Sequence, residues 1–573
     1  MAFPWPSWIS LLLLGYVEGK NMALLAINRN QTDRQNARTY RIPLCTALIL
    51  LLSVSVCSPT LQAENRVQVK IPTATEVGAA CLPDRIAPVS APFPIIEFRK
   101  PQFPDVTLSI VERGARENVL STRAIQAAID ELSSQGGGTV LIPAGKWLSG
   151  RISLKNDVNL RIAEGAELRF SGKIEDYLPP VFTRSAGYEV ISTGALIYAN
   201  GQANIAITGK GTLYGPPMDS PIRKKSIGYG SLDKTVTAQY NRPVHERVYD
   251  GTRNGGKIFL PTFITPINCK NVYIEGITLE KTAFWNIVPV YCDGVIIRGV
   301  TVNSVGIPMG DGLDIDSSRN VLIEYSTLNA GDDCFTMKAG RNEDGVRVNR
   351  PTENVVVRFC LAKKGHGGIT VGSETAGTIR NLYLHDCVFQ GTGTGIRFKT
   401  RRPRAGGGEN ITLERIRMNL SGTAIKADML GSKMYVGELA SRFPPRPRTE
   451  LTPRFANVLI KDIIVENTPQ FIKIAGIPES PFTNLKIQNA DVNCKNLIKI
   501  ADARDILLKN IVIRAENTKL SLLDVSNLMF DHVSFDPPIE ESDLAGDNTS
   551  NIHFQNCTPE KPSDWQTTHY IRN

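Results

Sequence analysis

The sequence lacks the residue spacings that hold most metal ions in proteins. Its 573 residues include ten cysteines, but no Cys-x-x-Cys pair and no cluster of histidine with cysteine. We therefore expect no metal site and no cofactor. A basic helix, a zinc-finger spacing and a motif of aromatic and basic residues are also missing, so we expect no nucleic acid as a partner.

Positive charge exceeds negative charge only mildly. The formal net charge is +9, and the first 63 residues hold five Lys or Arg and two acidic residues, which leaves +6 for the rest of the chain. An excess of this size suits a polyanionic partner without selecting one.

Long hydrophobic runs are also scarce. One apolar run, Leu44–Val56, is short for a membrane span and ends in small and polar residues. Basic residues precede it: Arg29, Arg34, Arg38 and Arg41. This pattern predicts a leader over residues 1–63 with a secretory signal cut after Ala63, and an uncleaved anchor is the alternative. We expect an exported chain, periplasmic or secreted, with no membrane association after cleavage.

A short pattern recurs from about residue 200 onward. Each unit has an Asn, alternating apolar residues and a polar pair, as in "NVYIEGITL" and "NVLIEYSTL". Units begin at residues 271, 294, 320, 354, 381, 410, 457, 484, 505 and 551, with Gly at 294 and Asp at 505 in the Asn place. Because no helix-period segments lie between these strands, the repeat predicts the coils of a parallel β-helix, an all-β solenoid. A β-sandwich or a propeller is the alternative.

The Asn positions suit the corners between strands. Asn tolerates a left-handed backbone and forms local hydrogen bonds, and Asn residues stacked on successive coils can form amide ladders. Before the repeat, Ile125, Ala128, Ile129 and Leu132 have helical spacing, Ser121 and Thr122 can cap the helix start, and the glycines at 136–138 end it. This helix is expected to cover the N-terminal end of the solenoid.

The rest of the organisation follows from composition. Residues 64–105 are Pro-rich and without a clear period, which indicates an extended arm, and residues 106–573 form the predicted β-helix domain. Several cysteines hold fixed places in the repeat: Cys269, Cys292, Cys360, Cys387 and Cys557. We interpret them as stacked core thiols, with a Cys269–Cys292 disulfide as the alternative.

Polar residues interrupt the repeat in one zone, residues 308–404, in four clusters. They are Asp311 with Asp314 and Asp316, the pair Asp332–Asp333, His366 among glycines, and Arg397 with Lys399. The clusters lie about one coil apart, allowing for insertions, so they should line one groove. Each alone has a plainer interpretation. Asp beside Gly is usually a turn, Asp314 and Asp316 could be a solvated face or a calcium site, His366 could be structural, and Arg397 with Lys399 a solvated edge.

Carboxylates on two sides of a groove fit hydrolysis of a glycosidic bond. One protonated acid donates to the leaving oxygen and another carboxylate activates water, at a separation of about 6.5–9.5 Å in inverting enzymes. Repulsion between close carboxylates raises the pKa of one of them. Gly331 is expected to let both Asp332 and Asp333 reach the groove at a coil corner. A cationic pair would bind carboxylates on the sugar.

At these residues the sequence resembles glycoside hydrolase family 28, the polygalacturonases. Four motifs of the family are found in order: Met-Gly-Asp-Gly at 309–312 in place of Asn-Thr-Asp-Gly, Gly-Asp-Asp at 331–333, Gly-His-Gly at 365–367, and Arg-x-Lys at 397–399.

The resemblance implies a right-handed parallel β-helix and metal-free hydrolysis of polygalacturonate with inversion. It implies that Asp332 is the general acid, that Asp311 and Asp333 are bases holding the attacking water, and that His366 orients or tunes the acid. Arg397 and Lys399 would bind the galacturonate carboxylate beyond the cleaved bond. Met309 and Gly310 depart from the motif, which leaves sugar contacts there in doubt.

The expected partner is therefore an acidic polysaccharide, polygalacturonate or pectin oligomers, bound by a monomer. Insertions at 214–258, 338–353 and 426–452 could close one end of the groove, as in bacterial exo-acting members. Two rival functions remain: a calcium-dependent pectate lyase, which Asp314 and Asp316 would serve, and a non-enzymatic polysaccharide-binding β-helix.

Overall fold

The structure is a computed structural model that describes residues 69–228 and 231–559. The predicted leader, residues 1–63, lies outside the described residues. Among the described residues, no helix is long and apolar enough to cross a membrane.

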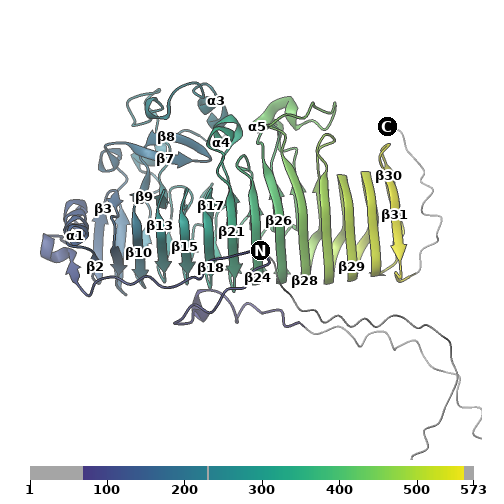
Figure 1. Ribbon diagram of the computed structural model, residues 1–573, viewed down its shortest axis with the longest axis horizontal. Helices are drawn as coiled ribbons and strands as arrows, with labels where there is room; N and C mark the ends of the chain where they lie inside the picture. The colour runs from purple at the N-terminus through teal and green to yellow at the C-terminus, as the bar shows by residue number, and fades with distance from the viewer. Residues whose placement is uncertain (1–68, 229–230, 560–573) are drawn as a thin grey trace, which may run out of the picture. The chain divides into compact units, whose positions relative to one another are not determined.

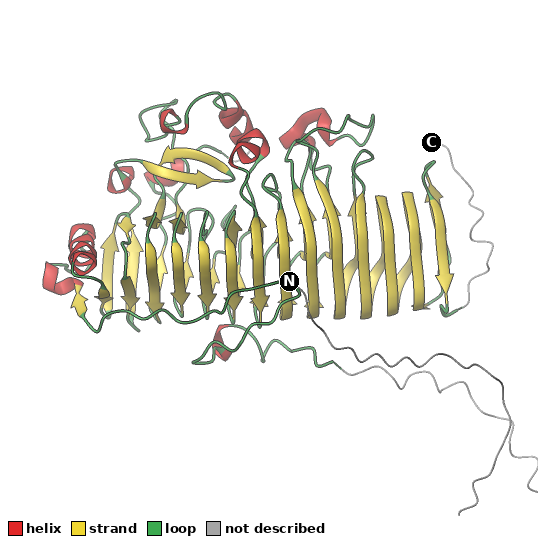
Figure 2. Ribbon diagram, viewed as in Figure 1, coloured by secondary structure: helices red, strands yellow, loops and turns green. Residues whose placement is uncertain are grey.

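Strands dominate the described chain, and they stack in parallel coil upon coil (Figures 1 and 2). Each coil contributes to three faces, which we name the first, second and third sheets. The first sheet holds β1 Thr107–Ser109, β2 Gly138–Ile142, β5 Val158–Ile162, β10 Ala203–Gly209, β13 Lys270–Glu275, β15 Asp293–Arg298, β18 Arg319–Glu324 and β21 Thr352–Arg358. The second holds β3 Gly145–Ser149, β6 Ala166–Phe170, β11 Thr212–Tyr214, β14 Thr278–Glu280, β16 Thr301–Asn303, β19 Thr327–Asn329 and β22 Leu361–Ala362. The third holds β4 Ile152–Ser153, β9 Ala195–Asn200, β12 Thr262–Ile267, β17 Leu313–Asp316, β20 Phe335–Lys338, β23 Gly367–Val371, β25 Thr394–Lys399 and β27 Thr423–Asp428.

Toward the C-terminus the strands run on through the corners. These are β24 Ile379–Gln390, β26 Gly407–Asn419, β28 Arg454–Ala475 and β29 Phe482–Asp536, followed by β30 Ser542–Ala545 and β31 Ser550–Gln555. One antiparallel hairpin, β7 Val181–Ser185 and β8 Tyr188–Ser192, stands apart from the coils. The parallel β-helix predicted from the repeat is confirmed, and the sandwich and propeller alternatives are excluded.

Corner asparagines give the repeat its shape. Asn271, Asn320, Asn354 and Asn381 all have left-handed φ angles, between 53° and 56°. Their side chains form the expected amide ladder, in which Asn381 Nδ2 donates to Asn354 Oδ1 at 2.9 Å and Asn354 in turn donates to Asn320. Because the left-handed region is costly for most L-residues, this turn selects Asn, and Gly294 (φ 75°) occupies the same corner.

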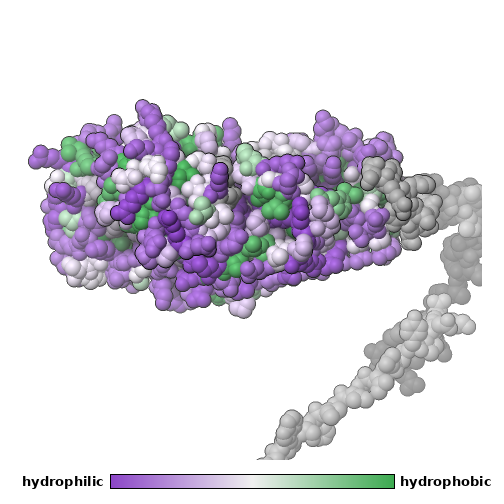
Figure 3. Space-filling view, turned by 90° about the horizontal axis from the view of Figure 1, so that it is seen from above, coloured by the Kyte–Doolittle hydropathy of each residue, from purple (hydrophilic) through white to green (hydrophobic). Residues whose placement is uncertain are grey.

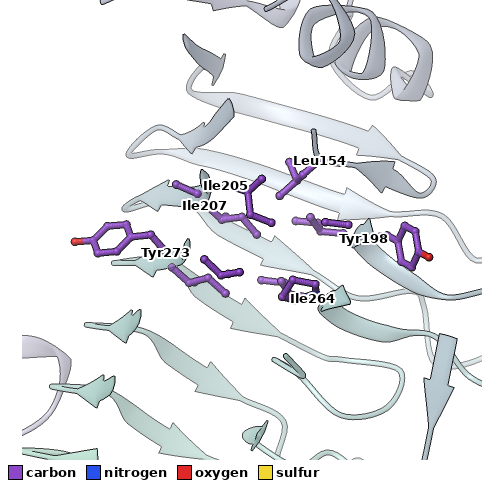
Figure 4. A pocket seen from close by; sticks show the side chains of 12 residues that line it. Leu154, Tyr198, Ile205, Ile207, Ile264 and Tyr273 are labelled. Carbon is purple, nitrogen blue, oxygen red and sulfur yellow. The ribbon is translucent and has the colours of Figure 1, made fainter. Parts of the chain in front are cut away.

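The interior of the coils is tightly packed with apolar side chains. Figure 4 shows one small gap between coils, lined by aliphatic residues such as Leu154, Ile205 and Ile264. The hydroxyls of Tyr198 and Tyr273 point away from it, so the gap has no polar group to hold a water (Figure 4). The repeat cysteines are buried free thiols, and the alternative Cys269–Cys292 disulfide is not formed.

The predicted capping helix is present as α1 Thr122–Ser134, which buries Ile125, Ile129 and Leu132. Glycines 136–138 follow it with positive φ angles, as expected. The expected cap by Ser121 is wrong, since its hydroxyl instead donates to the carbonyl oxygens of Arg116 and Val119. The other helices lie in insertions: α2 Pro221–Lys224, α3 Leu232–Thr237, α4 Asn342–Val348 and α5 Lys433–Val436. Single 3-10 turns are η1 Ala79–Cys81, η2 Ile110–Arg113, η3 Ile174–Tyr177, η5 Val244–Glu246 and η6 Gly437–Ala440.

Residues 69–105 have little regular structure and run along the outside of the coils, first beside the second sheet, where Val77 packs on Leu361, and then along the first sheet. Phe98 and other apolar residues of this segment form one cluster there with outward-facing side chains of four coils, namely Tyr273, Ile296, Leu322 and Val356. Arginines of the coils bind the carbonyl groups of this segment, as Arg298 does with Pro83 at 2.7 Å and Arg358 with Ala87 at 2.8 Å. Hydrogen bonds and apolar contacts therefore attach the segment to many coils at once.

Candidate active site

The polar clusters meet where the strands of the third sheet begin. Asp311 precedes β17, Asp332 and Asp333 precede β20, and His366 precedes β23, while Arg397 and Lys399 lie within β25. These four strands are successive neighbours in parallel register. The coil spacing therefore brings the predicted site residues together as expected.

Close backbone packing builds this corner. A Cβ atom at Gly331 would lie 2.1 Å from the carbonyl oxygen of Ile307, so only glycine fits there. The sequence prediction gave Gly331 a different task, the local break in alternation, but the structure uses its lack of a side chain. Gly367 has a similar role, because a Cβ there would lie 2.8 Å from Asp333 Oδ1.

Asp333 is fully buried and held by two cations. Arg397 Nη1 donates to Asp333 Oδ1 at 2.8 Å, and Lys399 Nζ donates to Oδ2 at 2.5 Å. Burial alone would raise the pKa of Asp333, but the charges of Lys399 and Arg397 outweigh it and hold this pKa well below its usual range. Asp333 is therefore the ionised carboxylate of the cluster.

Asp332 is the most exposed carboxylate of the three, with 19% of its side chain accessible. Its Oδ1 lies 2.8 Å from Nδ1 of His366, whose own side chain is 64% exposed. The hydrogen bond to Asp332 raises the pKa of His366. The site thus opens to solvent at the Asp332–His366 pair.

Asp311 is buried with one oxygen, Oδ1, lacking a hydrogen-bond partner within the described part of the chain. Burial raises its pKa well above the usual value, and repulsion from Asp314 and Asp332 adds to this. The cluster therefore places a carboxyl group whose pKa is raised, Asp311, beside one whose pKa is lowered by its two cations, Asp333.

The expected separation of 6.5–9.5 Å between acid and base is not what the structure has. One carboxylate oxygen from each of Asp311, Asp332 and Asp333 lies within 4.8 Å of the others. The three are closer because two are adjacent in sequence at one corner and the third lies on the neighbouring coil. Such a cluster could bind a cation, but both oxygens of Asp333 are already taken by Arg397 and Lys399.

Asp314 and Asp316 are not a solvated face, which corrects one of the plainer interpretations. Both are buried, and burial raises the pKa of each. Asp316 pairs with buried Arg184 at 3.0 Å. Neither oxygen of Asp314 has a hydrogen-bond partner among the described residues, although Lys338 Nζ lies 3.7 Å away.

Sequence reasoning missed the buried ions behind the site. Lys338 bonds Glu374 at 2.9 Å and lies 4.5 Å from the centre of the Trp285 ring. Arg341 also pairs with Glu374. The sequence offered one signal of these ions. Lys338 is a charged residue that shares a face of β20 with Thr336, so it could have been expected to lie near the site.

Two of the three insertions, which carry α3 and α4, lie together near the β7–β8 hairpin (Figure 1). Arg247 of the first insertion binds Asp344 of α4 at 2.7 Å, and Tyr188 and Val190 of the hairpin pack on the third sheet with Trp285. The third insertion, with α5, lies nearer the C-terminal coils (Figure 1). Its Arg442 binds Asp502 of β29 at 2.7 Å. From above, this edge of the coils is mostly hydrophilic with small hydrophobic patches (Figure 3).

Comparisons with known proteins agree with this geometry. The model of the glycosyl hydrolases family 28 matches residues 247–431. A probable polygalacturonase of Vitis vinifera is 28% identical over 388 residues, 65% of this chain and 71% of that protein. An exo-poly-alpha-D-galacturonosidase of Dickeya chrysanthemi is 25% identical over 341 residues, 56% of each chain.

Solved structures show the same likeness. A hyperthermoactive exopolygalacturonase from Thermotoga maritima superposes with a TM-score of 0.63 at 27% identity, over 73% of this chain and 93% of that one. A polygalacturonase from Erwinia carotovora subsp. carotovora shares the fold, with a TM-score of 0.52 at 20% identity, over 72% of this chain and 99% of that one.

Proposed function

The chain belongs to glycosyl hydrolase family 28, and on that premise we propose that it hydrolyses the α-1,4 bonds between galacturonate units of polygalacturonate. The observation that carries the proposal is the carboxylate cluster itself. A solvent-exposed carboxyl group, Asp332, stands beside an ionised one, Asp333, whose cations can also meet a substrate carboxylate. This arrangement suits an acid and a base that act on an acidic sugar.

In the proposed mechanism Asp332 protonates the leaving glycosidic oxygen, since it is the carboxyl group that a sugar can reach. Asp333 accepts a proton from the attacking water, and Asp311 beside it helps to hold that water. His366 positions Asp332 through their 2.8 Å contact. Arg397 and Lys399 bind the carboxylate of the sugar beyond the cleaved bond.

Inversion is part of the proposal, although the carboxylates are closer than is usual for inverting enzymes. A retaining mechanism needs a carboxylate that contacts the anomeric carbon directly. Asp333 is fully buried and Asp311 is only 2% exposed, so a small water molecule between them and the sugar is sterically easier than direct contact of either with the anomeric carbon. The anomer formed first, read by proton NMR during hydrolysis, decides between the two outcomes.

We further propose exo action. Going from β25 back toward the N-terminus, the outward side chains of the third sheet are Thr370, Thr336 and Asp314, and all three are fully buried. The hairpin and the first two insertions cover the coils before them. A polymer bound at the site can therefore extend in one direction only, which favours cleavage at a chain end. The expected export of the chain to the periplasm or medium would bring it to this polymer.

The test is incubation with polygalacturonate in the presence of a chelator, with products sized over time. Saturated mono- or digalacturonate that appears early, with slow loss of viscosity, supports the proposal. A ladder of oligomers contradicts exo action, and unsaturated, UV-absorbing products that require calcium would establish the lyase instead. A protein that binds the polymer without any turnover would be the non-enzymatic module.

A further inference from the structure

On the third sheet, three lysines lie in register with Arg397 on the strands that follow β25. Arg397 of β25 pairs in register with Lys426 of β27, Lys426 with Lys473 of β28, and Lys473 with Lys499 of β29. We name Lys426, Lys473 and Lys499 the lysine ladder. Its exposure increases away from the site, since Lys426 is half-buried while Lys473 and Lys499 are exposed.

The ladder is electrostatically unfavourable for the protein alone. Adjacent strands lie about 4.8 Å apart, and like charges directly opposite one another destabilise a sheet. Within the described residues, none of the three lysines forms an ion pair or a hydrogen bond. Burial lowers the pKa of Lys426 and the neighbouring charges of Arg397 and Lys473 lower it further, while the charge of Asp428 offsets only part of this.

Other faces of the same coils pair their charges across strands. On the first sheet, for example, Arg380 binds Glu353 of the preceding coil at 2.7 Å, and Lys461 binds Glu414 at 2.7 Å. The ladder is thus a local exception to a rule that this fold otherwise follows. An uncompensated row of cations of this kind is expected where an external anion supplies the missing charge.

The rows beside the ladder leave room for a sugar chain. On one side stand neutral polar residues in register: Thr423, Gln470 and Asn496. On the other side the row runs from Asp428, whose carboxylate accepts from the backbone N–H groups of Leu430 and Gly431, to Ala475 and Ala501. The third insertion borders the alanine side, where Arg442 binds Asp502 and where Phe443 is 55% exposed.

We propose that the lysine ladder binds the carboxylates of successive galacturonate units on the far side of Arg397 and Lys399, and so holds the uncleaved remainder of the polymer. The inference rests on the proposed function and extends it from one sugar beyond the cleaved bond to several. Each coil advances the ladder by one lysine, a step comparable to the length of one sugar unit. The buried residues at the opposite end of the row allow no such extension.

The experiment measures binding in an inactive background, Asp332→Asn, by titration calorimetry with galacturonate oligomers of two to eight units. The test variant adds Lys473→Gln and Lys499→Gln. The matched control adds Lys486→Gln, which removes an exposed lysine of the same strand, β29, on the first sheet. Thermal unfolding of all variants checks that they fold alike.

The expected result is a Kd about five- to tenfold weaker for octagalacturonate in the test variant, from two contacts of the strength of exposed ion pairs. The dimer should bind equally well in all variants, and the salt dependence of octamer binding should be less steep in the test variant. If the test variant binds the octamer as tightly as the Asp332→Asn background does, or if Lys486→Gln weakens binding equally, the proposed role of the lysine ladder is wrong. The proposed function would not be affected by either result. Failure of the wild-type chain to hydrolyse polygalacturonate would instead overturn the proposed function.

Discussion

Lys399→Met tests most directly whether the cations beside Asp333 hold this carboxyl group ionised. The substitution keeps most of the side-chain volume and removes one of the two cations on Asp333, whose carboxylate is fully buried. An opposite charge at this distance lowers a carboxyl pKa by about 1–3 units. Each unit corresponds to about 1.4 kcal/mol, so the native state should lose about 1–4 kcal/mol at neutral pH.

The sign of the pH dependence follows from the lowered pKa of Asp333. Its ionised form stabilises the native state at every pH above the unfolded value of about 3.9, and this contribution is lost as the pH falls through the native pKa. With Lys399→Met the native pKa lies closer to the unfolded value, so less stability is present above about pH 3.9 and its loss on acidification is complete at a higher pH. The acid limb of kcat/KM should move upward by about 1–3 units for the same reason.

Two measurements check this prediction: urea unfolding from pH 8 down to about pH 2, and the pH–rate profile on polygalacturonate. The control is Lys433→Met, which breaks an exposed pair with Glu438 and should cost less than about 1 kcal/mol. If Lys399→Met leaves both the acid limb and the unfolding free energy where they are in the wild type, then Asp333 is not held ionised by its cations and the assignment of the base is wrong.

Three shorter predictions follow from the same site. Asp332→Asn should reduce turnover by several orders of magnitude with polymer binding retained, and unchanged turnover would remove Asp332 as the acid. The imidazole of His366, followed by NMR, should titrate above the ordinary pKa of about 6.5 and return toward it in Asp332→Asn, since the raising contact is then lost; an identical pKa in both would contradict the contact. Hydrolysis should persist in chelator, because the cations on Asp333 occupy the oxygens that a metal would need, and recovery of activity only on adding calcium would refute this.

The sequence was most informative at positions where the backbone conformation requires a particular residue type. Asn at a left-handed corner recurs once per coil, so the repeat predicted both the fold and the meeting of Asp311, Asp332 and His366. It could not predict the separation of the carboxylates, which depends on the side-chain directions at one corner. Nor could it predict the burial of Asp314 and Asp316, because that follows from packing by remote segments such as the β7–β8 hairpin, which carries Arg184.

The division into a leader (residues 1–63), an arm (64–105) and a β-helix domain (106–573) stays a prediction. The described part of the arm is an extended segment that packs on the outside of the first and second sheets.

That packing changes how the solenoid should unfold. In a stack of coils each unit contacts only its neighbours, so such chains tend to lose their ends one unit at a time. Here one segment binds Arg298, Arg358 and Arg417 on separated coils. It couples the stability of those coils, so fraying of one coil weakens the contacts that hold the others. The middle of the stack is thereby tied into a single cooperative block, and the coils beyond this block, toward β31, remain the part that can open independently.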